Sequence, residues 1–391
     1  MTSETVKGFQ DFLGEDAKKR ERMIDLIRNQ FNLFGFEPAE TPIVENEDFV
    51  RGKNQNDEAV RDIFSLEDRG KRKLALRFEF TFQLKRIAKN QKLPYKRYQI
   101  GYVFRDEPIR KGRLRQFIQC DADIIGSSLK EEAECLAMAK NIYQELKIPA
   151  KIYINNRKLI NEILEEEKIM EKNREQIIRE LDKLDKLTKE EVAKNLKEFN
   201  AAKLVEIFTA KEKTFEKYKF YSEIKKLRDL CAVYGVQLEF RPFLARGLSY
   251  YNGTVFEIWS EEMNVALTGG GSYLVDGIQS TGISFGLEPL FLISKVEFGN
   301  ESIMVLSISQ DQQAINITQK LREKKIPVVL LTDKSPSKAL DYANSKKIER
   351  VLIIGEEEVK SKKYTLKNMK TGKEEKLSER ELLDKVQVAC G

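Results

Sequence analysis

The sequence of 391 residues contains no histidine. This absence excludes Ser-His-Asp and Cys-His catalysis, imidazole metal sites and a histidine general base. Cysteine is scarce as well, and no two cysteines form a C-x-x-C pair; the four are Cys120, Cys135, Cys231 and Cys390. A disulfide framework and a structural zinc site are therefore not expected, and we assign no metal ligands.

Long hydrophobic runs are also absent. No run approaches ~18 apolar residues, and the first seven residues lack the apolar centre of a signal peptide. We therefore expect a soluble protein of the cytoplasm that has no membrane partner. Charged residues make up 34% of the chain, and the net charge is +6. Such a modest excess suits a polyanionic partner, but the argument for one must depend on where the cations lie.

The length predicts two or three domains, because one ordinary core does not accommodate 391 residues. Helical spacing of apolar residues predicts a helix at 16–35, and two prolines interrupt an extended segment at 36–50. Polar and apolar residues alternate in several later runs, which indicates antiparallel strands with one polar face. These runs are 73–82, 97–104, 117–125 and much of 237–288, with a helix at 128–146 and a glycine-rich turn at 269–271.

Two segments differ in composition from the rest. Residues 157–232 contain no glycine or proline and repeat Ile and Leu at helical spacing, which predicts a helical insertion. After Phe298 strands and helices alternate, which indicates a compact α/β domain with parallel strands and a Lys-rich hairpin at 363–376. We therefore expect one domain at 1–300, which includes the insertion, and a second at 301–391.

The most informative segment is a strand that ends in Arg105 and Glu107. A loop with four more cations follows, and the aromatic Phe117 begins the next strand. The planar fork of arginine suits bidentate phosphate contacts, and the end of a strand fixes where the fork points. The segment suits a nucleotide's phosphates or an approaching polyanion. Taken alone, the loop could equally be a solvated basic hairpin.

Several segments resemble the motifs of one enzyme family. The pattern Phe-Arg-x-Glu…Gly-Arg-x-Arg-Gln-Phe over 104–117 resembles motif 2 of class II aminoacyl-tRNA synthetases, in its histidyl form. Residues 7–11 resemble the opening of that family, and 35–42 and 282–288 resemble motifs 1 and 3. The peptide 244–257 resembles one that is found in histidyl-tRNA synthetases and their paralogues. The resemblance spans nearly the whole chain and is weakest in the helical insertion.

The resemblance implies an α+β fold. Its catalytic domain has an antiparallel sheet flanked by helices and a helical insertion, and a C-terminal α/β domain resembles the anticodon-binding domain. The implied activity is ATP-dependent conversion of L-histidine to histidyl-adenylate, followed by transfer to the 3′ end of the tRNA for histidine. Mg²⁺ would neutralise the polyphosphate of ATP. Motif 1 implies a homodimer, because its proline, Pro42, lies at the subunit interface in that family.

The resemblance also assigns residues to the substrates. In the ATP site, Arg105 would hold the α-phosphate and Phe117 would stack under adenine, with Glu107 and Arg113 beside them. Arg105 and Arg246 would stabilise the reacting α-phosphate and are the expected catalytic pair. The remaining assignments concern histidine: Glu79, Thr81 and Gln119 for its α-amino group, Asp123 and Tyr251 for its two ring nitrogens, Arg246 for its carboxylate, and Tyr250 and Tyr273 for the wall of the pocket.

Three departures from the family pattern leave an alternative open. Pro289 replaces the ATP-stacking arginine of motif 3, Phe78 and Phe80 flank Glu79, and Ser272 replaces an arginine after Gly271. The alternative is a non-catalytic paralogue, such as the regulatory subunit of ATP phosphoribosyltransferase. Such paralogues typically lack the C-terminal domain and the motif 2 arginines, and this chain has both.

Overall fold

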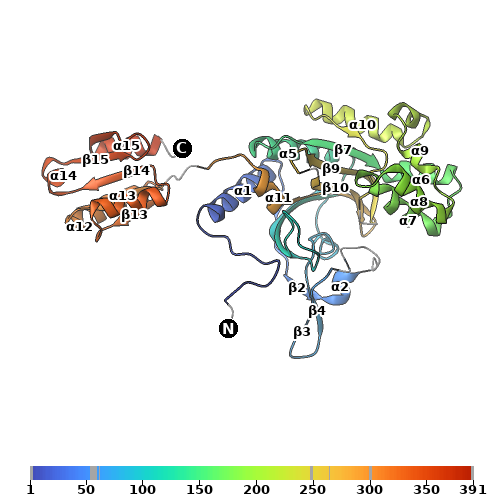
Figure 1. Cartoon of the computed structure of the whole chain (residues 1–391), viewed down its shortest axis with the longest axis horizontal. Coiled ribbons are helices and arrows are strands. Elements are labelled where there is room, and N and C mark those ends of the chain that lie inside the picture. The colour runs from blue at the N-terminus through green and yellow to red at the C-terminus, as the bar shows by residue number, and fades with distance from the viewer. Residues whose placement is uncertain are drawn as a thin grey trace. The chain divides into compact units, whose positions relative to one another are not determined.

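Figure 1 shows the N-terminal unit, in which α1 (Gly14–Leu33), α5 (Leu129–Glu145) and α11 (Leu287–Ile293) lie beside strands β7, β9 and β10. The unit is built on an eight-stranded sheet in the order β1-β5-β6-β11-β10-β9-β7-β8. The computed structural model describes residues 3–52, 60, 62–246, 250–263, 265–298 and 302–388, and it divides the chain into compact units at 1–296 and 297–391. The strands of this sheet are β1 (Glu37–Pro38), β5 (Tyr95–Phe104), β6 (Gln116–Ile125), β7 (Lys151–Asn156), β8 (Glu239–Phe240), β9 (Tyr251–Ser260), β10 (Val265–Val275) and β11 (Ile278–Gly286).

The central strands of the sheet pair antiparallel, as the alternating sequence predicts. Only the two-residue edge strands β1 and β8 pair in parallel with their neighbours. The glycine triplet 269–271 lies inside β10, so the predicted turn at this place is wrong. A run of glycines occurs in turns and also in strands that other groups approach closely. The sequence alone does not distinguish these two cases.

Three helices, α1 (Gly14–Leu33), α5 (Leu129–Glu145) and α11 (Leu287–Ile293), pack on one face of this sheet. The side chains of Met23, Ile27 and Phe31 on α1 are completely buried, and the Phe31 ring lies 5.2 Å from that of Tyr98 on β5. Gly35, with φ of +75°, follows the helix, where the left-handed conformation favours glycine. The predicted helix at 16–35 is thereby confirmed.

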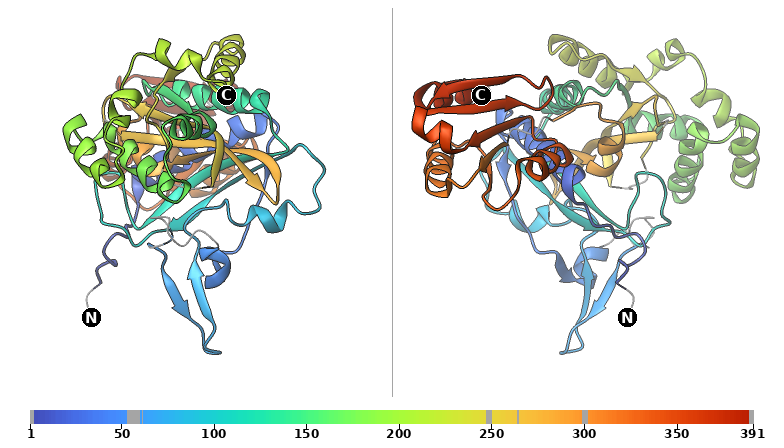
Figure 2. Two further views of the ribbon diagram at one scale, coloured as in Figure 1. Left: turned by 90° about the vertical axis from the view of Figure 1, so that its right-hand side faces the viewer. Right: turned by 60° about the vertical axis from the view of Figure 1, so that its left-hand side comes forward.

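A smaller three-stranded sheet projects from this body (Figure 2). It comprises β2 (Val44–Asn46), β4 (Lys73–Leu76) and β3 (Ser65–Glu67), with α2 (Glu47–Arg51) beside it. The prediction that 36–50 is extended is therefore wrong at its end. The predicted strand 73–82 also stops at Leu76, and α4 (Leu84–Ile87) follows. Arg77 explains this break, because its buried guanidinium donates to the backbone carbonyls of Tyr102 and Thr41, at 2.8 and 2.7 Å.

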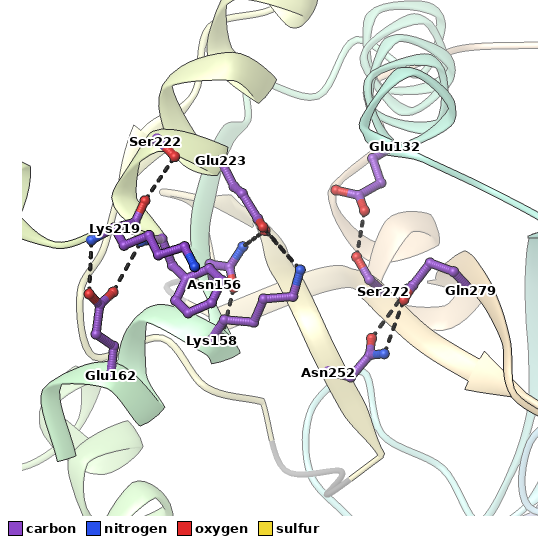
Figure 3. A network of polar contacts seen from close by, with 11 residues as sticks. Glu132, Asn156, Lys158, Glu162, Lys219, Ser222, Glu223, Asn252, Ser272 and Gln279 are labelled. Carbon is purple, nitrogen blue, oxygen red and sulfur yellow. Dashed lines mark hydrogen bonds and ion pairs between the residues drawn. The ribbon is translucent and has the colours of Figure 1, made fainter. Parts of the chain in front are cut away.

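The predicted helical insertion lies between β7 and β8. Its elements are α6 (Arg157–Glu166), α7 (Glu171–Asp182), η1 (Lys183–Asp185), α8 (Lys189–Leu196), η2 (Lys197–Phe199), α9 (Leu204–Phe208), η3 (Glu212–Lys217) and α10 (Tyr221–Val233). Polar contacts fasten it to the end of β7: Glu223 of α10 accepts from Asn156 at 2.8 Å and from Lys158 at 3.0 Å (Figure 3). The Glu162 carboxylate also accepts from the backbone N–H groups of Lys219 and Phe220.

The C-terminal unit is a five-stranded sheet in the order β13-β12-β14-β15-β16. The first three strands are parallel, as predicted, whereas β15 and β16 form the predicted Lys-rich hairpin and pair antiparallel. The helix α14 was not predicted. The elements are β12 (Ile303–Ser307), α12 (Asp311–Glu323), β13 (Val328–Leu331), α13 (Pro336–Ser345), β14 (Arg350–Ile354), α14 (Glu356–Ser361), β15 (Lys363–Asn368), β16 (Glu374–Ser378) and α15 (Glu379–Val388).

None of the helices in the described ranges is long and apolar enough to cross a lipid bilayer.

A buried ion pair joins α1 to α11 and the sheet. Arg20 Nη2 lies 2.7 Å from Glu288 Oε1, and the two side chains are 5% and 6% exposed. The Glu288 carboxylate also accepts from the backbone N–H of Ile118 on β6, at 3.1 Å. The carboxylate therefore has one partner on α1 and one on β6. Both are needed to compensate the hydration that Glu288 loses on burial.

We expect Arg20→Met to lower the free energy of unfolding by about 3–5 kcal/mol, because it leaves a buried carboxylate without its cation. Glu288→Gln in addition should recover part of this loss, since the amide oxygen still accepts from Ile118 while the charge is removed. Urea unfolding of both variants measures the difference. Equal stability of the single and the double variant would show that the charge of Glu288 is not the cause.

Candidate active site

On the face of the large sheet opposite α1 and α5, several glycines lie directly beneath charged side chains. A Cβ atom on Gly269 would lie 1.8 Å from the Arg246 guanidinium, and one on Gly282 would lie 2.2 Å from Asp123 Oδ1. On β5, a Cβ on Gly101 would lie 2.9 Å from a nitrogen of Arg77. Any larger residue would displace these side chains. Glycine is therefore required here because charged groups lie directly on the backbone of the sheet.

Arg105, Phe117 and Gln119 lie together at one end of this face. Arg105 follows β5, and its guanidinium donates to the carbonyl of Phe78 at 3.1 Å and to the side chain of Gln119 at 3.3 Å. The same guanidinium lies 5.2 Å from the centre of the Phe117 ring. Arg105 and Phe117 are partly exposed, so a ligand can reach both the cation and the ring.

Glu107 and Arg113 belong to the loop that joins β5 to β6 and lie apart from the buried groups. Arg113 is 57% exposed and lies 3.4 Å from the Glu107 carboxylate. Backbone hydrogen bonds between Arg110 and Arg113 close the tip of the loop into a tight turn. A Cβ on Gly112 would lie 3.5 Å from Pro289 Cα, so this tip lies against the start of α11. The cations of the loop are thus close to the position where the motif 3 arginine is missing.

Arg246 lies in the segment before β9, and its guanidinium lies over Gly269. Its backbone is left-handed, with φ of +64°, which is a strained conformation for a residue with a side chain. Its guanidinium donates to Glu257 Oε1 at 3.0 Å, and Asp182 of the insertion accepts from the backbone N–H of Ala245 at 2.8 Å. Contacts on both sides therefore hold Arg246 in place. Residues 247–249 of the same peptide lie outside the described residues.

Three tyrosines line the face beside Arg246. The Tyr250 ring lies 4.8 Å from that of Tyr251 and 5.5 Å from that of Tyr273. Burial raises the pKa of the Tyr250 hydroxyl well above its usual value, the Glu79 carboxylate raises it further, and a hydrogen bond with Thr81 opposes the rise. Glu79 and Thr81 therefore lie near Tyr250, as their common assignment to the histidine pocket predicts.

Asp123 lies on the same face beside Tyr273, and both of its oxygens face protein groups. Oδ1 accepts from the Tyr273 hydroxyl, and Oδ2 lies 2.7 Å from Arg97 Nη2. Arg97 is completely buried, and its guanidinium also donates to the carbonyl of Phe80 at 3.2 Å. Burial raises the pKa of Asp123, whereas Arg97 and Tyr273 lower it. Arg97 was not predicted, although it is opposite Asp123 in the register of β5 and β6.

A second carboxylate, Asp121, was also missed. It lies between Gln119 and Asp123 on β6, and alternation along a strand brings all three to the same face. Its Oδ2 accepts from Gln119 at 2.8 Å, and Ser284, which is opposite Asp121 in the register of β6 and β11, also interacts with the carboxylate and lowers its pKa. Burial raises the pKa of Asp121 to about 7, and the neighbouring Asp123 adds to the rise. The alternation Gln-x-Asp-x-Asp was the signal in the sequence.

The three departures have different structural consequences. Ser272 points away from the site and donates to the buried Glu132 of α5 at 2.5 Å, so this change lies on the helix side of the sheet (Figure 3). Phe78 and Phe80 are buried, and their backbone carbonyls accept from Arg105 and Arg97. Pro289 lies against the tip of the loop that joins β5 to β6, next to Gly112. In the described ranges, no group of three Cys, Asp or Glu side chains is placed to hold a metal ion.

We expect Asp121→Asn to change how stability depends on pH. An unfolded aspartate has a pKa of about 4, so between about pH 4 and pH 7 the folded wild type binds a proton that the unfolded chain does not. This contribution to stability is present at low pH and is lost as the pH rises through 7. The variant should therefore match the wild type near pH 4 and melt at a higher temperature near pH 8. Parallel melting curves over this range would contradict the assignment.

Comparisons with known proteins agree with this geometry. A family model described as histidyl-tRNA synthetase matches residues 8–290, and one described as anticodon binding domain matches 302–388. Histidine–tRNA ligase 1 of Bacillus cereus is 33% identical over 96% of this chain and 98% of its own length. Histidine–tRNA ligase of Phocaeicola vulgatus is 31% identical over 96% of this chain and 97% of its own length.

Solved structures give the same result. The histidyl-tRNA synthetase from Nostoc sp. PCC 7120 matches with a TM-score of 0.86 at 25% identity, and all of both chains is covered. An ATP phosphoribosyltransferase regulatory subunit/histidyl-tRNA synthetase from Bacillus halodurans C matches with a TM-score of 0.76 at 20% identity, over 91% of this chain and 98% of that one, which shows a shared fold. The chain belongs to the histidyl-tRNA synthetase family of class II aminoacyl-tRNA synthetases.

Proposed function

We propose that this protein uses ATP to activate L-histidine and then transfers the histidyl group to the 3′ end of the tRNA for histidine. The observation that carries the proposal is that cations from two separated segments, Arg105 and Arg246, lie on the same face of the sheet as the buried polar pocket of Asp121, Asp123 and Tyr273. Family membership independently supports the same reaction.

The first step needs no protein base, which suits a chain without histidine. The carboxylate of the substrate is ionised at neutral pH and attacks the α-phosphorus of ATP. A new oxygen–phosphorus bond forms as pyrophosphate leaves. Arg105 and Arg246 would stabilise the negative charge that develops on the α-phosphate, and alignment of the two substrates lowers the barrier further. Mg²⁺ would enter as part of the nucleotide substrate and neutralise its polyphosphate.

ATP would occupy the end of the site near β5 and β6. We assign the α-phosphate to Arg105 and the adenine ring to Phe117, with Glu107 and Arg113 on the adjoining loop. Arg105 and Phe117 are already in contact with each other, which supports a common ligand. Arg113 is exposed, and the neighbouring Gly112 lies against Pro289, so we propose that Arg113 offsets the missing motif 3 cation.

Histidine would lie across the middle of the face. Its α-amino group is assigned to Glu79, Thr81 and Gln119, its carboxylate to Arg246, and its ring to Asp123, Tyr251 and the wall formed by Tyr250 and Tyr273. To these residues we add Asp121, because its buried carboxylate and raised pKa suit a ligand that brings an N–H group. An apolar amino acid would offer Asp121 no N–H group, and a buried polar group left without its partner can give discrimination of about 10⁴-fold.

The remaining assignments concern assembly. We propose that residues 1–300 carry out activation, that 301–391 bind the tRNA, and that the protein acts in the cytoplasm. A homodimer would form through the motif 1 segment, in which both residues of β1 are exposed. A non-catalytic paralogue, the alternative, is less well supported, because Arg105 and the anticodon-binding segment are both present.

The decisive measurement is ATP–pyrophosphate exchange that depends on histidine. We expect exchange by the wild type and a fall of kcat by about 10²–10³-fold in Arg246→Met, because one cation is removed from the developing charge. Arg72→Met is the matched control, since Arg72 is an exposed arginine in the β3–β4 turn and pairs only at the surface. Folded wild-type protein that catalyses no exchange at any histidine concentration would favour the regulatory paralogue.

Pro289 permits a gain-of-function test. Position 289 lies in the first turn of α11, where arginine is compatible with a helix, and it faces the loop that carries Arg113. We expect Pro289→Arg to lower the KM for ATP by roughly tenfold, which corresponds to about 1.4 kcal/mol for one added cation–phosphate contact. Pro289→Ala, which adds no charge, should leave this KM unchanged. If both variants behave alike, the missing cation does not limit ATP binding.

A further inference from the structure

Beside the Arg246–Glu257 pair lies a cluster of aromatic rings around a single arginine. The guanidinium carbon of Arg241 lies 3.4 Å from the centre of the Tyr153 ring, 4.8 Å from that of Trp259 and 5.8 Å from that of Phe243. The Tyr153 and Trp259 rings meet edge to face, with their centres 6.3 Å apart. We call the three residues Tyr153, Arg241 and Trp259 the arginine stack.

The arginine stack lies on the face of the sheet that carries the site. Tyr153 of β7 is opposite Glu257 of β9 in the register, and Trp259 follows Glu257 by two residues on the same strand. Opposed residues and residues two apart share a face. The Trp259 indole N–H donates to Glu257 Oε2 at 2.9 Å, while Arg246 donates to Oε1 of the same carboxylate. The stack is therefore continuous with the proposed reaction centre.

The segment that carries Arg241 is held in place by the backbone. The Arg241 N–H donates to the carbonyl of Ile154 at 3.0 Å, and the Asn155 side chain donates to the carbonyls of Pro242 and Leu244, at 2.5 and 2.9 Å. The geometry of the stack is thus fixed before any ligand arrives, which lowers the entropy lost on binding.

Packing alone does not explain the stack. All three of its side chains are partly exposed, whereas aromatic residues that serve the core of this unit, such as Phe256 and Phe285, are completely buried. Burial raises the pKa of Asp185 in the insertion, and the charge of Arg241 partly opposes this rise, so Arg241 could serve to join the insertion to the sheet. That purely structural role is the alternative that an experiment has to exclude.

We propose that the arginine stack is a platform for an unpaired base near the 3′ end of tRNA, next to the nucleotide that accepts the histidyl group. A guanidinium plane backed by an aromatic ring suits a base, because bases stack on arginine planes and aromatic rings in single-stranded RNA recognition. The positive charge of Arg241 also favours the adjoining phosphate. The accepting nucleotide has to reach the activated carboxylate near Arg246, which places its unpaired neighbour within reach of the stack.

This inference rests on the proposed function but concerns only its second step. Activation of histidine does not involve the stack, whereas transfer to tRNA does. The two half-reactions can be measured separately on the same protein. Failure of histidine-dependent exchange in the wild type would overturn the proposed function, and failure of the variants below to affect transfer would overturn only the inference.

The test compares Arg241→Lys and Tyr153→Leu with the wild type. Lysine keeps the charge of Arg241 but loses the planar fork, so it separates stacking from simple attraction. We expect both variants to raise the KM for tRNA in aminoacylation by roughly 10-fold, within the range for the loss of one stacked base, and to leave exchange within about twofold of the wild type. Arg72→Lys, in the β3–β4 turn, is the matched control and should change neither reaction.

Other outcomes would count against the platform. A KM for tRNA that is unchanged in both variants overturns it. Equal losses in exchange and in aminoacylation also overturn it, because they would mean that the stack only supports Arg246 or the insertion. A loss in Tyr153→Leu that Arg241→Lys does not share would show that the guanidinium plane is not required, and would overturn Arg241 as a stacking surface.

A direct binding measurement is available because Trp259 is the only tryptophan in the chain. We expect a short single-stranded RNA that ends in CCA to quench its fluorescence, and Arg241→Lys to weaken this quenching. Inorganic tripolyphosphate, which offers charge without bases, should quench little. No quenching by the RNA, or equal quenching by tripolyphosphate, would contradict a stacking platform.

Discussion

The site depends on one steric constraint, which is that charged side chains lie directly against the backbone of the central sheet. Arg246 occupies the space that a side chain on Gly269 would need, and Asp123 does the same at Gly282. Neighbouring antiparallel strands bring these glycines onto one face, while the opposite face carries the apolar residues that pack on α1 and α5. One face of the sheet therefore carries the site, and the other packs against the helices. Alternation of side chains along each strand makes this separation possible.

The second constraint is electrostatic. Two buried carboxylates, Asp121 and Asp123, share one buried guanidinium, that of Arg97. Burial raises the pKa of Asp121 to about 7 and the neighbouring Asp123 adds to the rise, so the charge of Arg97 compensates the two carboxylates only in part. A ligand that brings a hydrogen-bond donor or a positive charge removes this imbalance, whereas an apolar ligand leaves it in place. The selectivity for a polar ring that we propose would depend on this arrangement of carboxylates, which exists before the ligand binds.

Much of this fold could be predicted from the sequence, because alternation and helical spacing report local structure directly. β5, β6, α1 and the C-terminal strands are where the patterns place them. The failures concern long-range contacts. Residues 77–82 look like a strand, yet Arg77 has to satisfy carbonyls on two other segments, and 269–271 look like a turn only when the side chains above them are unknown.

The same distinction applies to the site. Motif residues such as Arg105 and Phe117 could be named from the sequence, and they do meet. Arg97 and Asp121 could not be assigned, because their importance comes from burial and from neighbours across the strands. An alternating strand shows which residues share a face, but it does not show which face receives a ligand. The face that receives a ligand can be identified only when it is known that helices cover the other face.

Glu257 shows how closely the parts of the site depend on one another. One of its oxygens orients Arg246, and the other accepts from Trp259, so a single carboxylate joins the cation that suits the first chemical step to the aromatic surface that we assign to the second. Asp182 of the insertion restrains the same segment through Ala245. A movement of the insertion would therefore change the position of Arg246 and, through Glu257, that of Trp259. Glu257 therefore marks the boundary between the two proposed surfaces: it contacts Arg246 on one side and a ring of the arginine stack on the other.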